Sequence, residues 1–128
     1  MSAQRSEITV LVVDDDEDIR FAMSDTLEAE GFRVVLARDG LDALATLRAG
    51  NGHPNLILLD LMMPNMDGWG FRAAQQQDPS LAQIPVVIVS ADSRVTQKAA
   101  ELGVAGSLAK PVRVAELVAV IEKFSTAS

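Results

Sequence analysis

The chain has 128 residues, 48% of them hydrophobic, so it is long enough for one globular domain with its own core. It has no cysteine, which excludes disulfides and thiolate metal sites, and no apolar run approaches the roughly 20 residues of a membrane span. The net charge is −7 and the basic residues are scattered, which argues against direct nucleic-acid binding. The N-terminus lacks the apolar core of a signal peptide, and we expect a cytoplasmic protein.

Apolar runs and helix-period segments alternate along the chain. Val, Ile and Leu dominate the first, third and fourth runs without polar alternation, which is typical of strands covered on both faces. The alternation predicts an α/β fold, a doubly wound parallel sheet of five strands with five helices on its two faces. The predicted strands are 8–13, 32–37, 55–60, 86–90 and 106–110, and the predicted helices lie near 19–31, 39–50, 68–77, 93–102 and 112–124.

We expect a single domain over residues 8–124, with flexible termini at 1–7 and 125–128. Ligands of such sheets bind beyond the carboxyl ends of the strands. The predicted strands end in polar residues, and these should converge on one edge of the sheet. They are Asp14, Asp15, Asp60, Ser90 and Lys110.

Each polar strand end also has an ordinary structural explanation. The five consecutive acids of 14–18 could cap a helix and complement its dipole, and this is the favoured interpretation for Asp16, Glu17 and Asp18. Asp60 could open a turn, and Ser90 could cap a helix. The functional interpretation depends on all of them falling where one site would need them.

The residue types indicate phosphoryl chemistry. Three carboxylates on adjacent strand ends suit a hard divalent cation, most simply Mg²⁺, which would also offset their repulsion. An Asp beside the cation can attack phosphorus and form an aspartyl phosphate. Lys110 and the Ser90 hydroxyl would then hold phosphoryl oxygens.

Four stretches resemble the receiver domain of bacterial two-component response regulators, and the resemblance covers residues 8–124. The stretches are "LVVDDDEDIR", "LILLDLMMPNMDGWGF", "IPVVIVSA" and "LAKP". The resemblance implies a flavodoxin-like strand order of 2-1-3-4-5. It implies that Asp60 is the phosphoacceptor, that Asp15 binds the metal directly and that Asp14 holds a metal-bound water. The backbone carbonyl of Met62 matches the remaining protein ligand.

The resemblance also assigns the residues around the acceptor. Ser90 matches the hydroxyl residue of the switch, and Lys110 matches the lysine that contacts phosphate, in a Lys110–Pro111 bond that is often cis in this family. Pro64, Asp67 and Gly68 match the turn after the acceptor. The implied role is phosphorelay signalling by a single-domain switch more than a turnover enzyme. Its partners would be a histidine kinase or histidine phosphotransfer protein and a downstream protein target.

Two positions depart from the family pattern. Many members carry an aromatic residue three positions before the lysine, where this chain has Ser107. The residue after the Lys-Pro pair is often Phe, and here it is Val112. Both positions lie near the face through which these domains usually signal.

Three alternatives remain open. The chain could be a receiver module cut from a longer regulator or a hybrid kinase. It could be an Asp-nucleophile phosphatase, although these usually place a second Asp where this chain has Met62. It could be a flavodoxin-like cofactor binder, although the acidic loop after the first strand would repel a cofactor phosphate.

Overall fold

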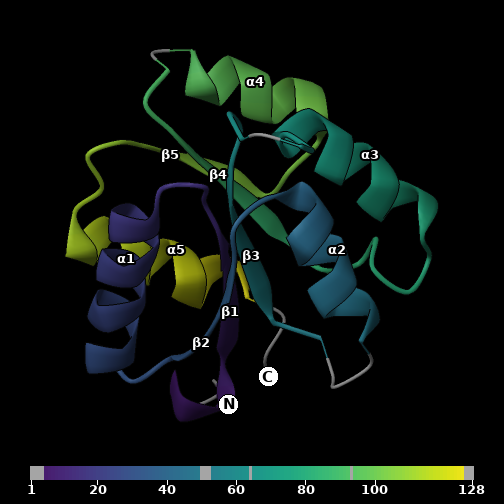
Figure 1. Ribbon diagram of the computed structural model, residues 1–128. Coiled ribbons are helices and arrows are strands. Elements are labelled where there is room, and N and C mark those ends of the chain that lie inside the picture. The colour runs from purple at the N-terminus through teal and green to yellow at the C-terminus, as the bar shows by residue number, and fades with distance from the viewer. Residues whose placement is uncertain (1–4, 50–52, 64, 93, 126–128) are drawn as a thin grey trace.

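The strands form one parallel sheet. They are β1 (Thr9–Val13), β2 (Arg33–Ala37), β3 (Leu56–Asp60), β4 (Val86–Ser90) and β5 (Gly106–Ala109). The computed structural model describes residues 5–49, 53–63, 65–92 and 94–125. Its sheet has the order β2-β1-β3-β4-β5 with every neighbouring pair parallel, which confirms the predicted doubly wound α/β fold (Figure 1).

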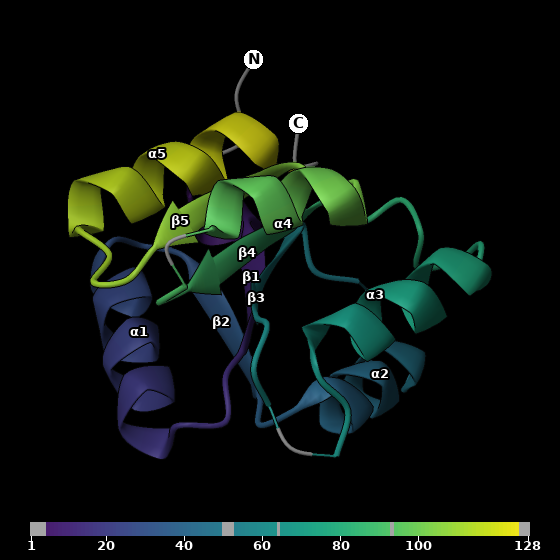
Figure 2. The ribbon, with the colours of Figure 1, turned by 90° about the horizontal axis from the view of Figure 1, so that it is seen from above.

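Helices cover both faces of this sheet. Within the described residues they are α1 (Glu17–Ala29), α2 (Gly40–Arg48), α3 (Gly68–Gln77), α4 (Val95–Leu102) and α5 (Val114–Phe124). Helices α1 and α5 pack on one face, and α2, α3 and α4 pack on the other (Figure 2). Successive strand residues point to opposite faces, so Leu11 and Val13 join the core beneath α2–α4 while Val10 and Val12 join the core beneath α1 and α5.

The central strands are buried on both faces. Every residue of β3 and β4 is buried, whereas the edge strands β2 and β5 are partly exposed. This burial explains why the runs 55–60 and 86–90 show no polar alternation. It also means that Asp60 and Ser90, the last residues of β3 and β4, are polar groups at the end of otherwise apolar strands.

The predicted element bounds agree closely with the structure. Helix α3 has the predicted limits, and α4 and α5 begin slightly later than predicted. Asp39 caps α2, because its carboxylate accepts the N–H of Asp42 at 2.8 Å. Gly31 and Gly103 both have positive φ, the backbone conformation that stops a helix, at the ends of α1 and α4.

The N-terminal segment contacts the domain. Residues Arg5–Glu7, which the sequence analysis assigned to a flexible terminus, form a short 3₁₀ helix. The Arg5 guanidinium donates to the Glu30 carbonyl at 3.1 Å and to the Glu122 carboxylate at 3.0 Å. The other terminal residues, 1–4 and 126–128, lie outside the described part. No helix in the described ranges has the length and hydropathy that crossing a bilayer requires.

Candidate functional site

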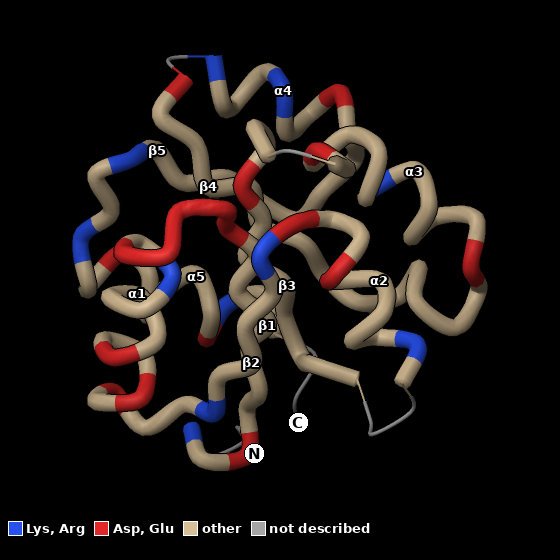
Figure 3. Tube along the Cα trace, in the orientation of Figure 1, with Lys and Arg blue, Asp and Glu red and all other residues tan. Residues whose placement is uncertain are grey.

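The predicted site residues lie at the carboxyl edge of the sheet. Asp14 directly follows β1, in the acidic segment drawn in red between β1 and α1 (Figure 3). Asp60 and Ser90 end β3 and β4, and Lys110 follows β5, with its N–H donating to the Ser90 carbonyl at 2.9 Å. The bond between Lys110 and Pro111 is cis, as the resemblance implied. Parallel pairing therefore brings these residues to one edge.

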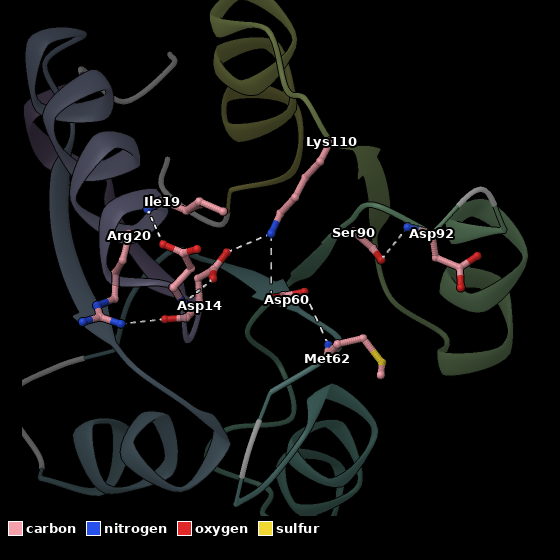
Figure 4. Close-up of polar contacts among 9 residues, drawn as sticks. Asp14, Ile19, Arg20, Asp60, Met62, Ser90, Asp92 and Lys110 are labelled. Carbon is pink, nitrogen blue, oxygen red and sulfur yellow. Dashed lines mark hydrogen bonds and ion pairs between the residues drawn. The ribbon is translucent and has the colours of Figure 1, made fainter.

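Asp14 is almost completely buried, at 3% exposed, and hydrogen bonds hold it in place. Its Oδ1 accepts the N–H of Asp16 at 2.9 Å, and its Oδ2 accepts the Lys110 ammonium at 3.1 Å (Figure 4). Its backbone carbonyl accepts the guanidinium of Arg20 at 2.9 Å. A buried carboxylate is costly unless it is paired, so Lys110 offsets much of the cost of burying Asp14.

Asp60 shares the same ammonium. Its Oδ2 lies 3.7 Å from Lys110 Nζ, and its Oδ1 accepts a long bond of 3.4 Å from the N–H of Met62. Burial raises the pKa of Asp60 above the ordinary value; Lys110 opposes this rise, and the nearby charge of Asp14 adds to it. The side chain keeps 11% of its surface exposed. Asp60 is thus a poorly solvated carboxylate, placed next to a cation and reachable from the sheet edge.

The carboxylates of Asp14, Asp15 and Asp60 form a group that could hold a metal ion. Their oxygens lie within 4.8 Å of one another, with Asp15 exposed and the other two buried. Three carboxylates and the one ammonium of Lys110 leave a formal charge of −2. Hard oxygen donors with this charge fit a divalent cation such as Mg²⁺, which keeps several waters. The donor set therefore fits the ion that the sequence implied.

Met62 was predicted to supply a backbone carbonyl. The structure places its N–H on Asp60, and its side chain is 67% exposed and turned away from the carboxylates (Figure 4). Met62 therefore lies next to Asp60, and its role as a ligand stays a prediction.

The remaining acids of the 14–18 run are structural, as the sequence analysis favoured. Asp16 caps α1, because its carboxylate accepts the N–H of Ile19 at 3.1 Å. Glu17 and Asp18 occupy the first turn of α1, where negative charge complements the helix dipole. Within this run only Asp14 and Asp15 join the group of carboxylates with Asp60.

Ser90 does not contact the carboxylates. It is 3% exposed, and its Oγ accepts the N–H of Asp92 at 3.1 Å. In Figure 4 this contact points away from Asp60 and Lys110. The structure thus brings the carboxylates and Lys110 together and leaves Ser90 beside them on a separate contact.

The loop between β3 and α3 is tied to the start of α2. Asn65 has a φ of 64°, and its amide donates to Asp39 at 2.8 Å. This bond, after the bond from the N–H of Asp42, lowers the pKa of Asp39. The N–H of Gly40 donates to the Met66 carbonyl at 3.0 Å, where a Cβ on Gly40 would lie only 2.7 Å from that oxygen.

The turn predicted after the acceptor is present. Asp67 caps α3 by accepting the N–H of Gly70 at 2.9 Å, and Gly68 donates its N–H to the Leu61 carbonyl at 2.9 Å. A Cβ on Gly68 would lie 2.8 Å from Leu61 Cα, so this close approach requires glycine. Pro64, the remaining residue of that prediction, lies outside the described residues.

Two polar networks were not predicted. Arg72 is buried and donates to the carbonyls of Leu102 and Gly103 at 3.2 and 2.9 Å, which ties α3 to the end of α4. The other network involves Lys98 of α4. Its side chain is only 17% exposed and bonds to Asp92 at 2.6 Å. No short-range sequence pattern indicates the hydrogen-bond partners of Arg72 or Lys98.

Comparison with known proteins gives a consistent result. The family model described as response regulator receiver domain matches residues 10–122. Protein PilG of Pseudomonas aeruginosa is 34% identical over 125 residues, which cover 95% of this chain and 90% of PilG. The chain also matches longer curated relatives and spans about half of their length, 45% to 48%.

Solved structures agree with the sequence matches. The chemotaxis protein CheY4 of Vibrio cholerae has a TM-score of 0.81 and 28% identity, covering 91% of this chain and 98% of that one. The cyanobacterial phytochrome response regulator RcpA, crystallised in a phosphorylated form, has a TM-score of 0.73 and 28% identity, covering 91% and 89%.

Proposed function

This chain belongs to the family of response regulator receiver domains, and we propose that it acts in two-component signal transduction as a phosphoryl acceptor. Asp60 accepts a phosphoryl group from the phosphohistidine of a histidine kinase or histidine phosphotransfer protein. The observation that carries this proposal is the position of Asp60, 3.7 Å from Lys110 and grouped with the carboxylates of Asp14 and Asp15. The phosphorylated form of the structural neighbour RcpA supports it.

The transfer exchanges one bond for another. A carboxylate oxygen of Asp60 forms a bond to phosphorus, and the P–N bond of the phosphohistidine breaks, returning its electron pair to the imidazole nitrogen. The acceptor must be ionised to attack. Burial raises the pKa of Asp60, which makes the carboxylate more basic, and the charge of Lys110 opposes that rise.

Lys110 then changes partners. In the unphosphorylated chain its ammonium bonds to Asp14 and lies near Asp60. After transfer it donates to a phosphoryl oxygen, where a compact point charge stabilises the negative charge. The Ser90 hydroxyl turns from Asp92 to donate to another phosphoryl oxygen.

The carboxylates would hold Mg²⁺ for this reaction. Asp15 would bind the ion directly, Asp14 would bind it through a water, and the backbone carbonyl of Met62 and the side chain of Asp60 would be the other protein ligands. The ion would supply positive charge that neutralises phosphoryl oxygens. The acidic group would otherwise repel the incoming phosphoryl group.

The product is a signalling state and not a released metabolite. A water later attacks phosphorus, the bond to Asp60 breaks, and inorganic phosphate leaves with the carboxylate restored. The chain thus catalyses only its own phosphorylation and dephosphorylation, and the phosphorylated form binds a downstream protein target differently.

Labelling with acetyl phosphate or a phosphorylated kinase tests the acceptor. The wild type should acquire a base-labile acyl phosphate in the presence of Mg²⁺, and Asp60→Asn should acquire none. An Asp25→Asn variant, altered at an exposed acid of α1, is the matched control and should label like the wild type. Full acyl-phosphate labelling of Asp60→Asn would refute the assignment.

Titration with Mg²⁺ tests the ion site. The emission of Trp69, the only tryptophan, provides a signal, and calorimetry provides an independent one. Asp15→Asn should weaken binding at least tenfold, whereas Asp16→Asn should not, because Asp16 caps α1. Loss of binding in Asp16→Asn alone would reverse the assignment of these two acids.

A further inference from the structure

A chain of polar contacts leads from Ser90 to helices α4 and α3. The N–H of Asp92 donates to Ser90 Oγ at 3.1 Å, as Figure 4 shows, and the Asp92 carboxylate accepts the Lys98 ammonium at 2.6 Å. The same ammonium lies 5.2 Å from the centre of the Trp69 ring. Ser90 ends β4, Lys98 lies in α4 and Trp69 lies in α3, so this series of contacts connects three elements. We call Asp92, Lys98 and Trp69 the latch.

The latch is more sheltered than an ordinary surface ion pair. The Lys98 side chain is 17% exposed and that of Asp92 is 30% exposed. The bond from Lys98, followed by the bond from the Arg94 N–H, lowers the pKa of Asp92 to about 2, so the carboxylate stays ionised at neutral pH. A charge-assisted bond that also places the cation over an aromatic ring is stronger than a solvated pair.

The latch fixes the backbone that holds Ser90. The Asp92 carboxylate also accepts the Arg94 N–H at 2.8 Å, and the Arg94 guanidinium lies 3.7 Å from it. These bonds hold the side chain of Asp92, and its N–H stays directed at Ser90 Oγ. A Ser90 hydroxyl that turns toward Asp60 must leave this N–H without its acceptor. The latch therefore stabilises the arrangement in which Ser90 faces away from the acceptor.

We infer that Lys98 is a positioning residue that acts through Asp92 to hold the Ser90 hydroxyl away from Asp60, and that release of this hydroxyl moves Lys98 relative to Trp69. The inference rests on the proposed function, since Ser90 has a reason to turn only when Asp60 is phosphorylated. Phosphorylation is then coupled to α4 and α3 through charged groups. By linkage, whatever opens the latch also favours the phosphorylated site.

Loosening the latch should strengthen binding of a phosphoryl mimic. The probe is beryllofluoride at saturating Mg²⁺, with its affinity measured by ¹⁹F NMR, a signal that does not depend on tryptophan. Lys98→Met keeps the apolar stem beside Trp69 and removes the charge. We expect it to bind beryllofluoride roughly fivefold more tightly than the wild type, the lower end of typical allosteric coupling.

Asp92→Asn removes the other charge and should act in the same direction, so the test survives if Lys98→Met fails to fold. The double variant should bind beryllofluoride no more tightly than either single variant, because each substitution removes the same ion pair between Asp92 and Lys98. Lys123→Met is the matched control: Lys123 also lies over a ring, 5.1 Å from Phe124, at the far end of α5, and its loss should leave affinity unchanged. Binding should shift Trp69 emission in the wild type and much less in Lys98→Met.

The inference about the latch would be overturned if Lys98→Met and Asp92→Asn both bound beryllofluoride with unchanged or weaker affinity while circular dichroism showed their folds intact. That result leaves the proposed function standing, because the wild type would still bind the probe. A wild type that binds no beryllofluoride would instead overturn the proposed function and the latch with it.

Discussion

Replacing the Asp60 carboxylate by the neutral amide of asparagine should stabilise the metal-free protein. At an effective dielectric constant of about 20, Coulomb's law gives about 4.5 kcal/mol of attraction between Asp60 and Lys110 at 3.7 Å. The same relation gives at least about 3.5 kcal/mol of repulsion from each of Asp14 and Asp15, whose oxygens lie within 4.8 Å. Water screens the exposed Asp15, so attraction and repulsion nearly cancel.

Because these charge interactions nearly cancel, desolvation of Asp60 decides whether the substitution raises or lowers the free energy of unfolding. Burial is the largest cause of the raised pKa of Asp60, which means that the ionised form is disfavoured in the folded state. Removing the charge should raise the free energy of unfolding by on the order of 1 kcal/mol, since unrelieved burial of an ion costs several kcal/mol. For a domain of this size, Tm should rise by roughly 3–5 °C.

Thermal unfolding in EDTA measures this difference between the wild type and Asp60→Asn. The folded-state pKa of Asp60 lies above 3.8, so protonation stabilises the wild type as the pH falls. The advantage of Asp60→Asn should therefore be full at neutral pH, should shrink as the pH falls through that pKa and should vanish below 3.8. Asp25→Asn is the control and should shift Tm little.

Added Mg²⁺ should reverse the order. An ion bound only by the folded state stabilises the wild type by about 1.4 kcal/mol at ten times its dissociation constant, and Asp60→Asn should gain less. A metal-free Asp60→Asn that is less stable than the wild type at neutral pH would refute this electrostatic account of the site.

Three further substitutions and one comparison with relatives test other parts of the chain. Lys110→Arg should fold but lose most of the response to beryllofluoride, because its donors lie elsewhere; an unaltered NMR response would contradict the role of Lys110. Gly68→Ala should cost about 1–3 kcal/mol in urea unfolding, since its Cβ would lie 2.8 Å from Leu61 Cα. Arg72→Met should cost about 1–3 kcal/mol by thermal melting, because the carbonyls of Leu102 and Gly103 lose their donor; a neutral effect would show that water replaces the guanidinium. Beryllofluoride should shift amides of 91–115 less than in relatives with an aromatic at the Ser107 position, and a large concerted shift would contradict this.

The fold could be predicted because local signals and the global topology agree. Apolar runs such as 55–60 and 86–90 are continuous in the sequence because β3 and β4 are buried on both faces. Once the strands are parallel, their carboxyl ends must share an edge, so the convergence of Asp14, Asp60 and Lys110 followed from order along the chain alone. The starts of α2 and α3 depend on similarly local contacts, since Asp39 and Asp67 accept N–H groups three residues further along the chain.

The side-chain partners could not be predicted in the same way. Arg72 bonds to carbonyls 30 and 31 residues away, and no local pattern distinguishes it from a solvated helical arginine. Lys98 has helical spacing typical of an exposed residue, and its burial depends on Trp69 from another helix. The Ser90 hydroxyl accepts the N–H of Asp92, and the sequence alone does not show whether this hydroxyl faces that N–H or Asp60.

The long-range side-chain contacts also bear on how the switch works. Ser107 pairs with Ile88, whose side chain lies in the core beneath α2–α4, so the missing aromatic would have filled the face that α4 covers. A buried ring supplies roughly 1–3 kcal/mol of apolar burial to whichever state encloses it. Here that face contains instead the charged contact of Asp92 and Lys98, which favours the state already formed. A buried aromatic would stabilise the phosphorylated state, whereas a charged contact of this kind stabilises the unphosphorylated state. The equilibrium of this chain should therefore depend on ionic strength and on charged partners that compete for Lys98, and much less on how well a side chain fills a cavity.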